Sequence, residues 1–455
     1  MTSGALAELR EKARQTHLAG DLDAALPLYV RYLAEVPGDA AMWSNLGVLF
    51  RRTSRPDQAL RAYARARAID PDDVGFMNNE ANTLNDIGRY EEAIALRRRI
   101  LSRRPDDVNQ LSMIGRALRS MGRLPQSIDH LRGAVARFPD EAELHLQLAL
   151  SLLAAGDFAE GFRRYQSRWQ TGELKPRDWP MPKWQPGDPL DGRTVLVVPE
   201  QGFGDAILFL RLLPLLKAKA AKVVYLSERP LIRLLQGIAG ADRVVGSLPD
   251  GFTADYHMPL MDLPPLGLDT PADIPPPTRL SVPADSIAGA EALTAPYRDR
   301  FRVGVVWSGS ETFKGNDFRS FSHRHLLPLA DVPGVQLFSL YKGPRTAELH
   351  ADGTSAFILD AGSGDRDFAD CAANMQAMDL VITSDTATLH LAGSLGVPTW
   401  AVLHWDAFWF FGHEGDTTPW YPGMRLFRQD SPRDWEGVFA RVEAALRDRV
   451  AEARS

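Results

Sequence analysis

The chain has 455 residues, of which 45% are hydrophobic and 24% are charged, so it is long enough for about three folded domains and shows no bias toward disorder. Its net charge of −6 argues against a broad attraction to nucleic acid, and its single cysteine, Cys371, excludes an intrachain disulfide. There is no apolar signal-peptide core at the N-terminus and no apolar run long enough for a membrane span, so we expect a cytoplasmic protein.

The first third of the chain is periodic. Four prolines recur at one constant interval, at Pro37, Pro71, Pro105 and Pro139. Glycines fall on the same interval, at Gly20, Gly88, Gly122 and Gly156, where one step of the series is skipped. A period of about 34 residues is typical of tetratricopeptide repeats, in which each unit is a pair of helices. We therefore predict an α-helical solenoid over residues 1–170.

One unit, residues 40–73, resembles a tetratricopeptide repeat closely. Its eight signature positions hold Trp43, Leu46, Gly47, Phe50, Ala59, Tyr63, Ala66 and Pro71. Further units start near Leu6, Val74, Val108 and Ala142. The last of them ends in the aromatic stretch Phe162–Trp169, and we interpret it as a capping unit. The array offers a groove for a protein or peptide partner; the alternative is a rigid spacer or an oligomerisation surface.

The sequence changes character after the repeats. Residues 171–193 are rich in proline and tryptophan, which predicts an extended linker. Strands are then expected at Thr194–Glu200, Lys222–Glu228, Arg243–Val245, Tyr256–Met261, Arg302–Trp307, Val335–Leu340, Ala356–Leu359, Leu380–Thr383 and Thr399–Leu403. Helices are expected at Asp205–Ala218, Pro230–Ile238, His325–Ala330, Phe368–Met378 and Thr386–Leu395. This alternation predicts an α/β fold with parallel sheets covered on both faces.

The expected elements fall into two Rossmann-like halves, residues 194–283 and 284–432, which face each other across a cleft. The carboxyl ends of the strands border this cleft, so residues that follow strands are candidate site residues. The proline-rich segment Pro264–Pro283 is interpreted as the hinge between the halves. The last helix, within residues 433–455, is amphipathic and is expected to pack back on the first half.

A glycine-rich turn follows the first expected strand and precedes a helix. Its residues are Gln201, Gly202, Phe203, Gly204 and Asp205. This turn does not fit a dinucleotide-binding fingerprint, which would need a third glycine where Ile207 stands and would not place Asp205 beside the pyrophosphate. One feature favours that fingerprint, namely Glu228 at the end of the second expected strand. Asp205 is either a helix cap or a general base that accepts a proton from an attacking hydroxyl. Gly202 and Gly204 leave room for a substrate.

The second candidate segment, Ser384–Gly393, follows the expected strand Leu380–Thr383. A helix is expected to begin near Thr386, where free backbone N–H groups and the threonine hydroxyl form an anion site. His390 lies four residues further along, on the same face of that helix, and so can reach a phosphate or a sugar oxygen. The alternative is a capped core helix with a buried histidine.

A third group of polar residues follows the strand that ends at Trp307. It comprises Ser308, Gly309, Ser310, Lys314, Asn316, Asp317, Arg319 and Ser320. A basic residue here would offset the charge on a leaving diphosphate; the alternative is a set of solvated loop charges. Asp365 and Asp367 form a D-x-D pattern that binds a metal-diphosphate in some transferases, but its place before a helix favours capping. No other cluster has metal-ligand spacing, so neither a metal nor a cofactor is expected.

Five segments occur in the order in which one enzyme family carries them: VLVVPEQGFGDAILFLRLLP, VVWSGS with NDFRS, SLYKGP, LVITSDTATLHLAGSLGVPTW and WYPGMRLFRQ. From Leu6 to about Asp430 the chain resembles tetratricopeptide-linked glycosyltransferases of the ADP-heptose heptosyltransferase type, and more distantly O-linked N-acetylglucosamine transferases. The resemblance implies a GT-B fold, in which two Rossmann-like domains face a cleft. It also implies inverting, metal-independent transfer from a nucleotide sugar.

The resemblance also implies roles for individual residues. Asp205 matches the catalytic base. The acceptor-side loop comprises Gln201, Gly202 and Gly204. The donor-binding residues are Ser308, Gly309, Lys314, Arg319, Tyr341, Asp385, Thr386, Ala387 and His390. Arg319 corresponds to the basic residue that faces the diphosphate, with Lys314 as the alternative.

The chain departs from the family at two places. Tyr341 stands where glutamine is common, and His404–Phe411 replaces a stretch rich in tryptophan and arginine. Both places are expected to touch the nucleotide base or the sugar, so the donor is left open. Some relatives that carry repeats glycosylate flagellin with a nonulosonic acid on CMP, a donor with one phosphate instead of two.

We therefore expect a cytoplasmic glycosyltransferase that moves a sugar from a nucleotide-sugar donor onto a protein acceptor held by the repeat groove, flagellin being one candidate acceptor. One alternative is a transferase for lipopolysaccharide or another glycan. Another is a non-catalytic adaptor whose transferase half binds a nucleotide sugar. Nucleic acid is not an expected partner.

Overall fold

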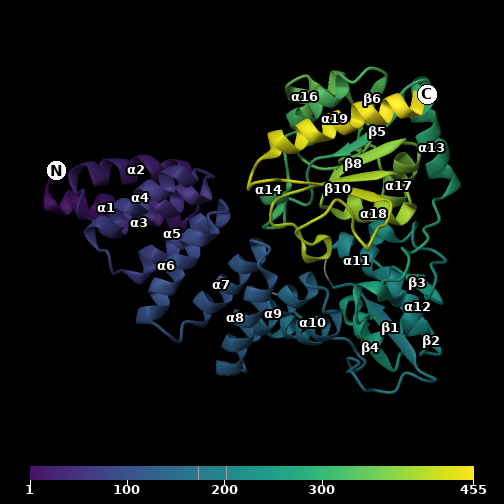
Figure 1. The fold of residues 1–455 in the computed structure, drawn as a ribbon, viewed down its shortest axis with the longest axis horizontal. Coiled ribbons are helices and arrows are strands. Elements are labelled where there is room, and N and C mark those ends of the chain that lie inside the picture. The colour runs from purple at the N-terminus through teal and green to yellow at the C-terminus, as the bar shows by residue number, and fades with distance from the viewer. Residues whose placement is uncertain (173, 201, 455) are drawn as a thin grey trace. The chain divides into compact units, whose positions relative to one another are not determined.

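The computed structural model describes residues 1–172, 174–200 and 202–454. The chain divides into two compact units, Met1–Ser151 and Leu152–Ser455, and each has its own architecture. The first unit is built of helices, and the second contains two sheets with their covering helices (Figure 1). Among the described residues, no helix combines the length and the apolar character that crossing a bilayer requires.

The first unit is a series of helices that pack in pairs along the chain. Their bounds are α1 (Ser3–Leu18), α2 (Leu22–Glu35), α3 (Ala40–Arg52), α4 (Pro56–Ile69), α5 (Val74–Asp86), α6 (Tyr90–Arg103), α7 (Val108–Ser120), α8 (Leu124–Arg137) and α9 (Ala142–Ala154). Four of them start behind an aspartate whose side chain accepts a hydrogen bond from the first turn, namely Asp21, Asp39, Asp73 and Asp107. The predicted helical solenoid is confirmed.

Small residues allow the two helices of a repeat to cross closely. A Cβ atom at Gly47 in α3 would overlap the ring of Tyr63 in α4, which is fully buried. A Cβ atom at Gly115 in α7 would overlap Leu131 in α8 in the same way. The repeat pattern of the sequence therefore reflects core contacts inside each helix pair.

The first sheet of the second unit is built from parallel strands. These are β1 (Thr194–Val198), β2 (Lys222–Leu226), β3 (Arg243–Val245) and β4 (Tyr256–Pro259), in the order β3-β2-β1-β4. The single helix expected over Asp205–Ala218 is divided into α11 (Phe203–Phe209), a 3-10 turn and α12 (Leu213–Lys217). Pro214 lies at this division, where its ring and missing N–H interrupt a continuous helix. The prediction of a helix at Pro230–Ile238 is wrong, because the chain forms a short 3-10 turn at Arg229–Leu231 instead.

The second sheet is parallel throughout as well. Its strands are β5 (Phe301–Val306), β6 (Val335–Ser339), β7 (Ile358–Asp360), β8 (Leu380–Ser384), β9 (Thr399–Leu403) and β10 (Met424–Arg428), in the order β10-β9-β8-β5-β6-β7. Its helices are α13 (Ala284–Thr294), α14 (Asn316–Arg319), α15 (Leu327–Ala330), α16 (Thr346–Ala351), α17 (Phe368–Gln376), α18 (Ala387–Leu395) and α19 (Trp435–Arg454). The edge strand β10 was not expected from the sequence. The α/β class with parallel sheets is confirmed.

The last helix, α19, runs beside the second sheet (Figure 1). Its main contacts are with β10, α15 and the turn His323–Leu326. Aromatic rings strengthen this packing, since the ring centroids of Phe321 and Phe439 are 4.7 Å apart. The helix therefore packs mainly on the second half, whereas the sequence suggested the first.

The division between the two units falls inside α9, before the expected boundary at residue 170. Helix α10 (Phe158–Tyr165) already belongs to the second unit. Within that unit, the ring of Phe158 lies 5.8 Å from Trp409 and that of Phe162 lies 6.3 Å from Phe209. The aromatic stretch after the repeats is therefore part of the α/β core.

Candidate functional site

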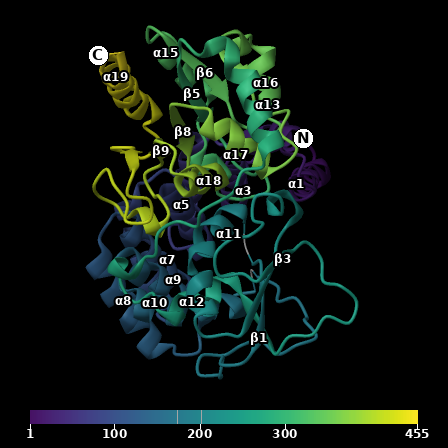
Figure 2. The same ribbon diagram turned by 90° about the vertical axis from the view of Figure 1, so that its right-hand side faces the viewer.

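The candidate site lies where the two sheets present the carboxyl ends of their strands. Helix α11 follows β1 and helix α18 follows β8, and these helices pack against each other (Figures 1 and 2). A Cβ atom at Gly204 in α11 would lie 3.0 Å from Cδ2 of His390 and 3.4 Å from Cα of Ala387. Gly204 therefore makes room for α18, whereas the sequence suggested that it makes room for a substrate.

Gly204→Ala is expected to lower the Tm of the second unit, because the added methyl group enters a contact that is already tight. Overpacking of this kind costs about 1–3 kcal/mol. Gly202→Ala is the matched control, since the nearest described atom to a Cβ there would be Oδ2 of Asp205, at 3.7 Å. Thermal unfolding of both variants measures the difference. Equal Tm values would mean that the two helices separate readily.

Asp205 stands in the first turn of α11. Its carboxylate accepts a hydrogen bond of 3.3 Å from the backbone N–H of Gly202. Burial raises the pKa of Asp205 to about 6, and the negative charge of Glu200 acts in the same direction, while Arg319 opposes it. Such a carboxyl is ionised at neutral pH and more basic than an ordinary aspartate. The side chain can therefore serve both as a helix cap and as a proton acceptor.

Helix α18 begins at Ala387, and Thr386 precedes it as the N-cap residue. The Thr386 side chain does not cap the helix; its hydroxyl lies 2.6 Å from the Thr388 hydroxyl. The anion site expected at this segment would therefore depend on the backbone N–H groups of the first turn. Asp385 is buried beside them, and burial together with the charge of Asp205 raises the pKa of Asp385 to about 7.

His390 is buried among aromatic side chains. Its ring centroid lies 5.2 Å from that of Phe410 and 5.8 Å from that of Tyr421, and its Nδ1 is 3.2 Å from the Tyr421 hydroxyl. Burial lowers the pKa of His390 to about 3, and the charges of Arg211 and Arg319 act in the same direction. The imidazole is therefore neutral at physiological pH and can meet a ligand only as a neutral hydrogen-bonding group.

Asn316 organises the loop that follows β5. Its Oδ1 accepts a hydrogen bond of 3.1 Å from the N–H of Gly309, and its Nδ2 donates one of 3.0 Å to Oγ of Ser308. A Cβ atom at Gly309 would lie 2.8 Å from Nη2 of Arg319 and 2.9 Å from Cγ2 of Thr386. The structure thus brings the second and third candidate segments of the sequence together.

Arg319 is the central cation of this group. Its positive charge opposes the rise in pKa that burial causes at both Asp205 and Asp385, so it acts on one carboxyl from each half. The guanidinium carbon lies 4.4 Å from the ring centroid of Phe313, and Nε is buried without a hydrogen-bond partner among the described residues. A partly buried guanidinium with an unused N–H is suited to an anionic ligand. Lys314, the alternative cation, is exposed.

Two aromatic residues border the same loops. Tyr341 is buried and packs on Trp307, with ring centroids 4.8 Å apart. His404 follows β9 directly, and its Nδ1 is buried with no hydrogen-bond partner in the part of the chain that the structure describes. Burial lowers the pKa of His404, and Arg319 acts in the same direction. The sequence placed His404 only within a divergent stretch; its position after a strand was the signal for a site residue. Gln201 lies outside the described residues.

The D-x-D pattern has separate structural roles for its two carboxyls. Asp367 caps α17 through the N–H of Ala369, at 2.9 Å, and pairs with Arg233. Asp365 is buried and accepts a hydrogen bond of 2.8 Å from Asn374, and burial raises its pKa to about 7. Across the described residues, no three His, Cys, Asp or Glu side chains are grouped so as to hold a metal ion.

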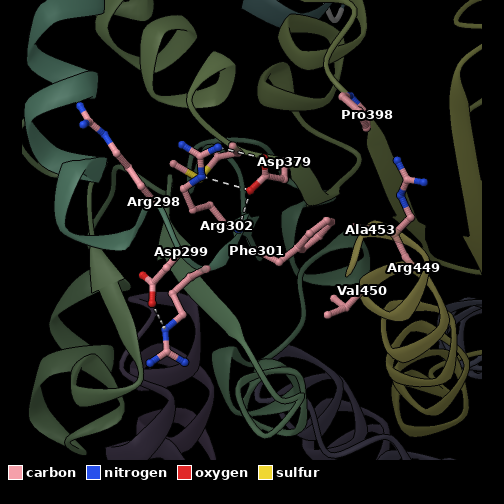
Figure 3. Close-up of a pocket in the computed structure, with 11 residues that line it drawn as sticks. Arg298, Asp299, Phe301, Arg302, Asp379, Pro398, Arg449, Val450 and Ala453 are labelled. Atoms are coloured by element: carbon pink, nitrogen blue, oxygen red, sulfur yellow. Dashed lines mark hydrogen bonds and ion pairs between the residues drawn. The ribbon is translucent and has the colours of Figure 1, made fainter. Parts of the chain in front are cut away.

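A cavity of about 570 Å³ lies at the opposite edge of the second sheet, where the strands begin (Figure 3). Arg302 closes part of its wall by binding Asp379, and Arg298, Arg300 and Arg449 also line it. None of the predicted site residues that the structure describes lines this cavity. It is therefore separate from the group around Asp205.

Comparison with known proteins identifies the first part of the chain. Tetratricopeptide repeat models match residues 19–74, 50–117 and 112–177. Solved structures that resemble the chain include MamA, which is 15% identical with a TM-score of 0.34 and corresponds to 39% of this chain and 100% of the MamA chain. A tetratricopeptide repeat protein from Parabacteroides merdae ATCC 43184 is 19% identical with a TM-score of 0.34, over 37% of this chain and 67% of its own.

The similarity to one curated relative extends beyond the repeats. Protein FlbA of Caulobacter vibrioides (strain ATCC 19089 / CIP 103742 / CB 15) is 28% identical over 338 residues, which cover 68% of this chain and 56% of FlbA. The chain thus spans a little over half the length of this relative. The match is longer than the repeat unit Met1–Ser151, so it includes part of the α/β unit. The chain is therefore a tetratricopeptide-repeat array followed by an α/β unit with two parallel sheets.

Proposed function

We propose that the second unit is a GT-B glycosyltransferase domain that transfers a sugar from a nucleotide sugar to a protein acceptor recruited by the repeats. The observation that carries the proposal is the group formed by Asp205, Arg319 and Asp385. A carboxyl after a strand of the first sheet thus lies near a cation and a carboxyl after strands of the second, because Gly204 packs against Ala387 and Gly309 packs against Arg319 and Thr386. A base from one half and an anion-binding group from the other are what transfer across a cleft requires.

In the proposed reaction the acceptor hydroxyl oxygen attacks the anomeric carbon of the donor sugar. Asp205 takes the hydroxyl proton as the new C–O bond forms, and it later releases that proton to solvent. The bond between the anomeric carbon and the donor phosphate oxygen breaks, and its electron pair leaves on the nucleotide. Arg319 and the N–H groups at the start of α18 offset the charge that develops on the leaving phosphate.

The neutral His390 fits this scheme as a hydrogen-bonding residue for a phosphate or a sugar oxygen. His404, whose ring nitrogen Nδ1 has no partner among the described residues, is a second neutral group of this kind near Arg319. A protein acceptor is favoured over a free glycan because the array precedes the α/β unit in the same chain and such arrays commonly bind protein partners.

A thermal-shift screen against nucleotide sugars tests the proposal. A ligand at about one hundred times its Kd stabilises the protein by about 2.7 kcal/mol, which a melting curve resolves. Donors with one and with two phosphates belong in the screen. Arg319→Ala is expected to weaken binding of the donor by about tenfold or more, because it removes a charge-assisted contact.

Arg319→Lys is the control, since it keeps the charge and loses the planar fork of donors. It should retain part of the affinity that Arg319→Ala loses. Nucleotide affinity that is identical in the wild type and both variants would contradict the placement of the donor. Absence of a shift with every nucleotide sugar would contradict the proposed function.

A further inference from the structure

One core position of the repeat array holds a charged residue. Tyr63 and Leu131 occupy this position in α4 and α8, where each meets a glycine of the partner helix. Arg97 stands one repeat after Tyr63 and one repeat before Leu131, in α6, and it is 0% exposed. Burying a charge is costly unless it is paired, so a cation in place of a core residue indicates a functional position.

The partners of Arg97 are neutral. Its Nη1 donates to Oε1 of Gln110 and its Nη2 donates to Oδ1 of Asn82, both at 2.8 Å. Its Nε is buried and has no hydrogen-bond partner within the described ranges. Burial lowers the pKa of Arg97 to about 10, and the charges of Arg116 and Arg51 act in the same direction. The guanidinium still remains charged at neutral pH, and its hydrogen bonds in the described part of the chain go to amide oxygens.

The arginine fixes the orientation of the amides around it. Because a guanidinium can only donate, Asn82 and Gln110 must turn their oxygens toward Arg97. Gln110 then donates from Nε2 to Oδ1 of Asn78, at 3.0 Å. Within the part of the chain that the structure describes, the side-chain N–H groups of Asn78 and Asn82 are therefore left for a further partner. They are four residues apart on α5, on one helix face, and both are partly exposed.

Arg116 adds a cation to the same surface. It is exposed on α7, at the repeat position that Asn82 occupies in α5, one repeat earlier. Two nearby acids that act on Arg97 are already engaged. Asp86 pairs with Arg51 at 2.5 Å, and Asp107 caps α7 through the N–H of Gln110. We call Asn78, Asn82 and Arg116 the donor surface, because their side chains present hydrogen-bond donors; the name does not refer to the sugar donor.

We propose that the donor surface binds an acidic segment of a protein partner, whose carboxylate and carbonyl oxygens accept hydrogen bonds from Asn78, Asn82 and Arg116. The argument is one of complementarity, because the three side chains present hydrogen-bond donors and one cation, and such groups bind acceptors and anions. The chain's net charge of −6 disfavours nucleic acid as the anion. The inference deepens the proposed recruitment of a protein by the repeats and rests on it.

Fluorescence anisotropy with the full chain tests the inference. The probes are a labelled peptide of alternating serine and glutamate and its counterpart of serine and glutamine. The acidic peptide is expected to bind the wild type about tenfold or more tightly than the neutral one. Asn82→Asp should lose this preference, because it replaces a donor with a negative charge. The same change gives Arg97 a carboxylate, so the Tm should stay the same or rise.

Arg116→Glu provides a second variant at an exposed position, where folding is not at risk, and it should lose the preference as well. Arg65→Glu is the matched control, because Arg65 is an exposed arginine of α4 outside the donor surface. Binding of neither peptide, equal binding of both, or wild-type affinity in Asn82→Asp and Arg116→Glu would overturn the inference. Peptide binding does not depend on nucleotide, so a negative nucleotide-sugar screen would defeat the proposed transfer and leave this result standing.

Discussion

Asp205→Asn is expected to lower the rate of sugar transfer by about a hundredfold or more, the usual scale for loss of a general base, while nucleotide binding stays nearly unchanged. Asparagine keeps the shape and one acceptor oxygen, so it still accepts the hydrogen bond from Gly202. Asp273→Asn is the matched control. Asp273 also accepts from the residue that precedes its turn, Thr270, but it is exposed and lies outside the candidate site. Transfer at the wild-type rate would mean that Asp205 is only a cap.

The pH profile separates the two roles further. With the pKa of Asp205 at about 6, kcat/KM of the wild type should rise as pH increases through 6, because only the ionised carboxyl accepts a proton. In Asp205→Asn, kcat/KM should no longer rise with pH in this range. The raised pKa also means that the folded state favours the protonated carboxyl, so its ionisation reduces stability as pH rises from about 4 toward 6. The variant should therefore be at least as stable as the wild type at neutral pH.

Arg168→Ala is expected to destabilise the second unit by about 3–5 kcal/mol, the usual result of removing one partner from a buried ion pair. The Arg168 side chain is 3% exposed and donates to both oxygens of Glu200, at 2.6 and 2.7 Å. It also binds Asp262 at 2.5 Å. Burial by itself would lower the pKa of Arg168. The hydrogen bonds and negative charges of Glu200 and Asp262 outweigh burial and hold that pKa above its ordinary value. Urea unfolding measures the change.

Arg193→Ala is the control for this measurement. Arg193 pairs with Asp255 at 3.0 Å, but both side chains are more than a third exposed, and such a pair contributes about 0–1 kcal/mol. Equal stability of the two variants would contradict the role given to Arg168. The pair with Glu200 also bears on the candidate site, because the charge of Glu200 raises the pKa of Asp205. Loss of Arg168 should therefore raise the pKa of Asp205 further and move the rise of kcat/KM to higher pH.

The main architecture follows from local sequence patterns. The constant interval between the repeat prolines predicted the helical array, because each repeat buries its core against its own second helix and its neighbours. The alternation of strands and helices predicted the parallel sheets, because both faces of such strands are covered and their sequences are apolar. Asp205, Thr386 and Arg319 were predicted as candidate site residues because their segments follow strands.

Other features depend on contacts between residues far apart in the chain. Gly204 lies close to His390, so its role is to allow helix packing, whereas the sequence suggested that it leaves room for a substrate. The packing of Phe158 and Phe162 inside the second unit moves the expected boundary toward the N-terminus.

The charge states of the site also required the tertiary structure. A pKa is set by burial and by neighbouring charges, and Asp205, Arg319 and Asp385 come from three distant segments. The same holds for Arg97, which the sequence presents as one of many exposed-type arginines. Its repeat position was visible in the sequence, but the direction of each hydrogen bond around it was decided only when the fold placed Asn82 and Gln110 at its guanidinium.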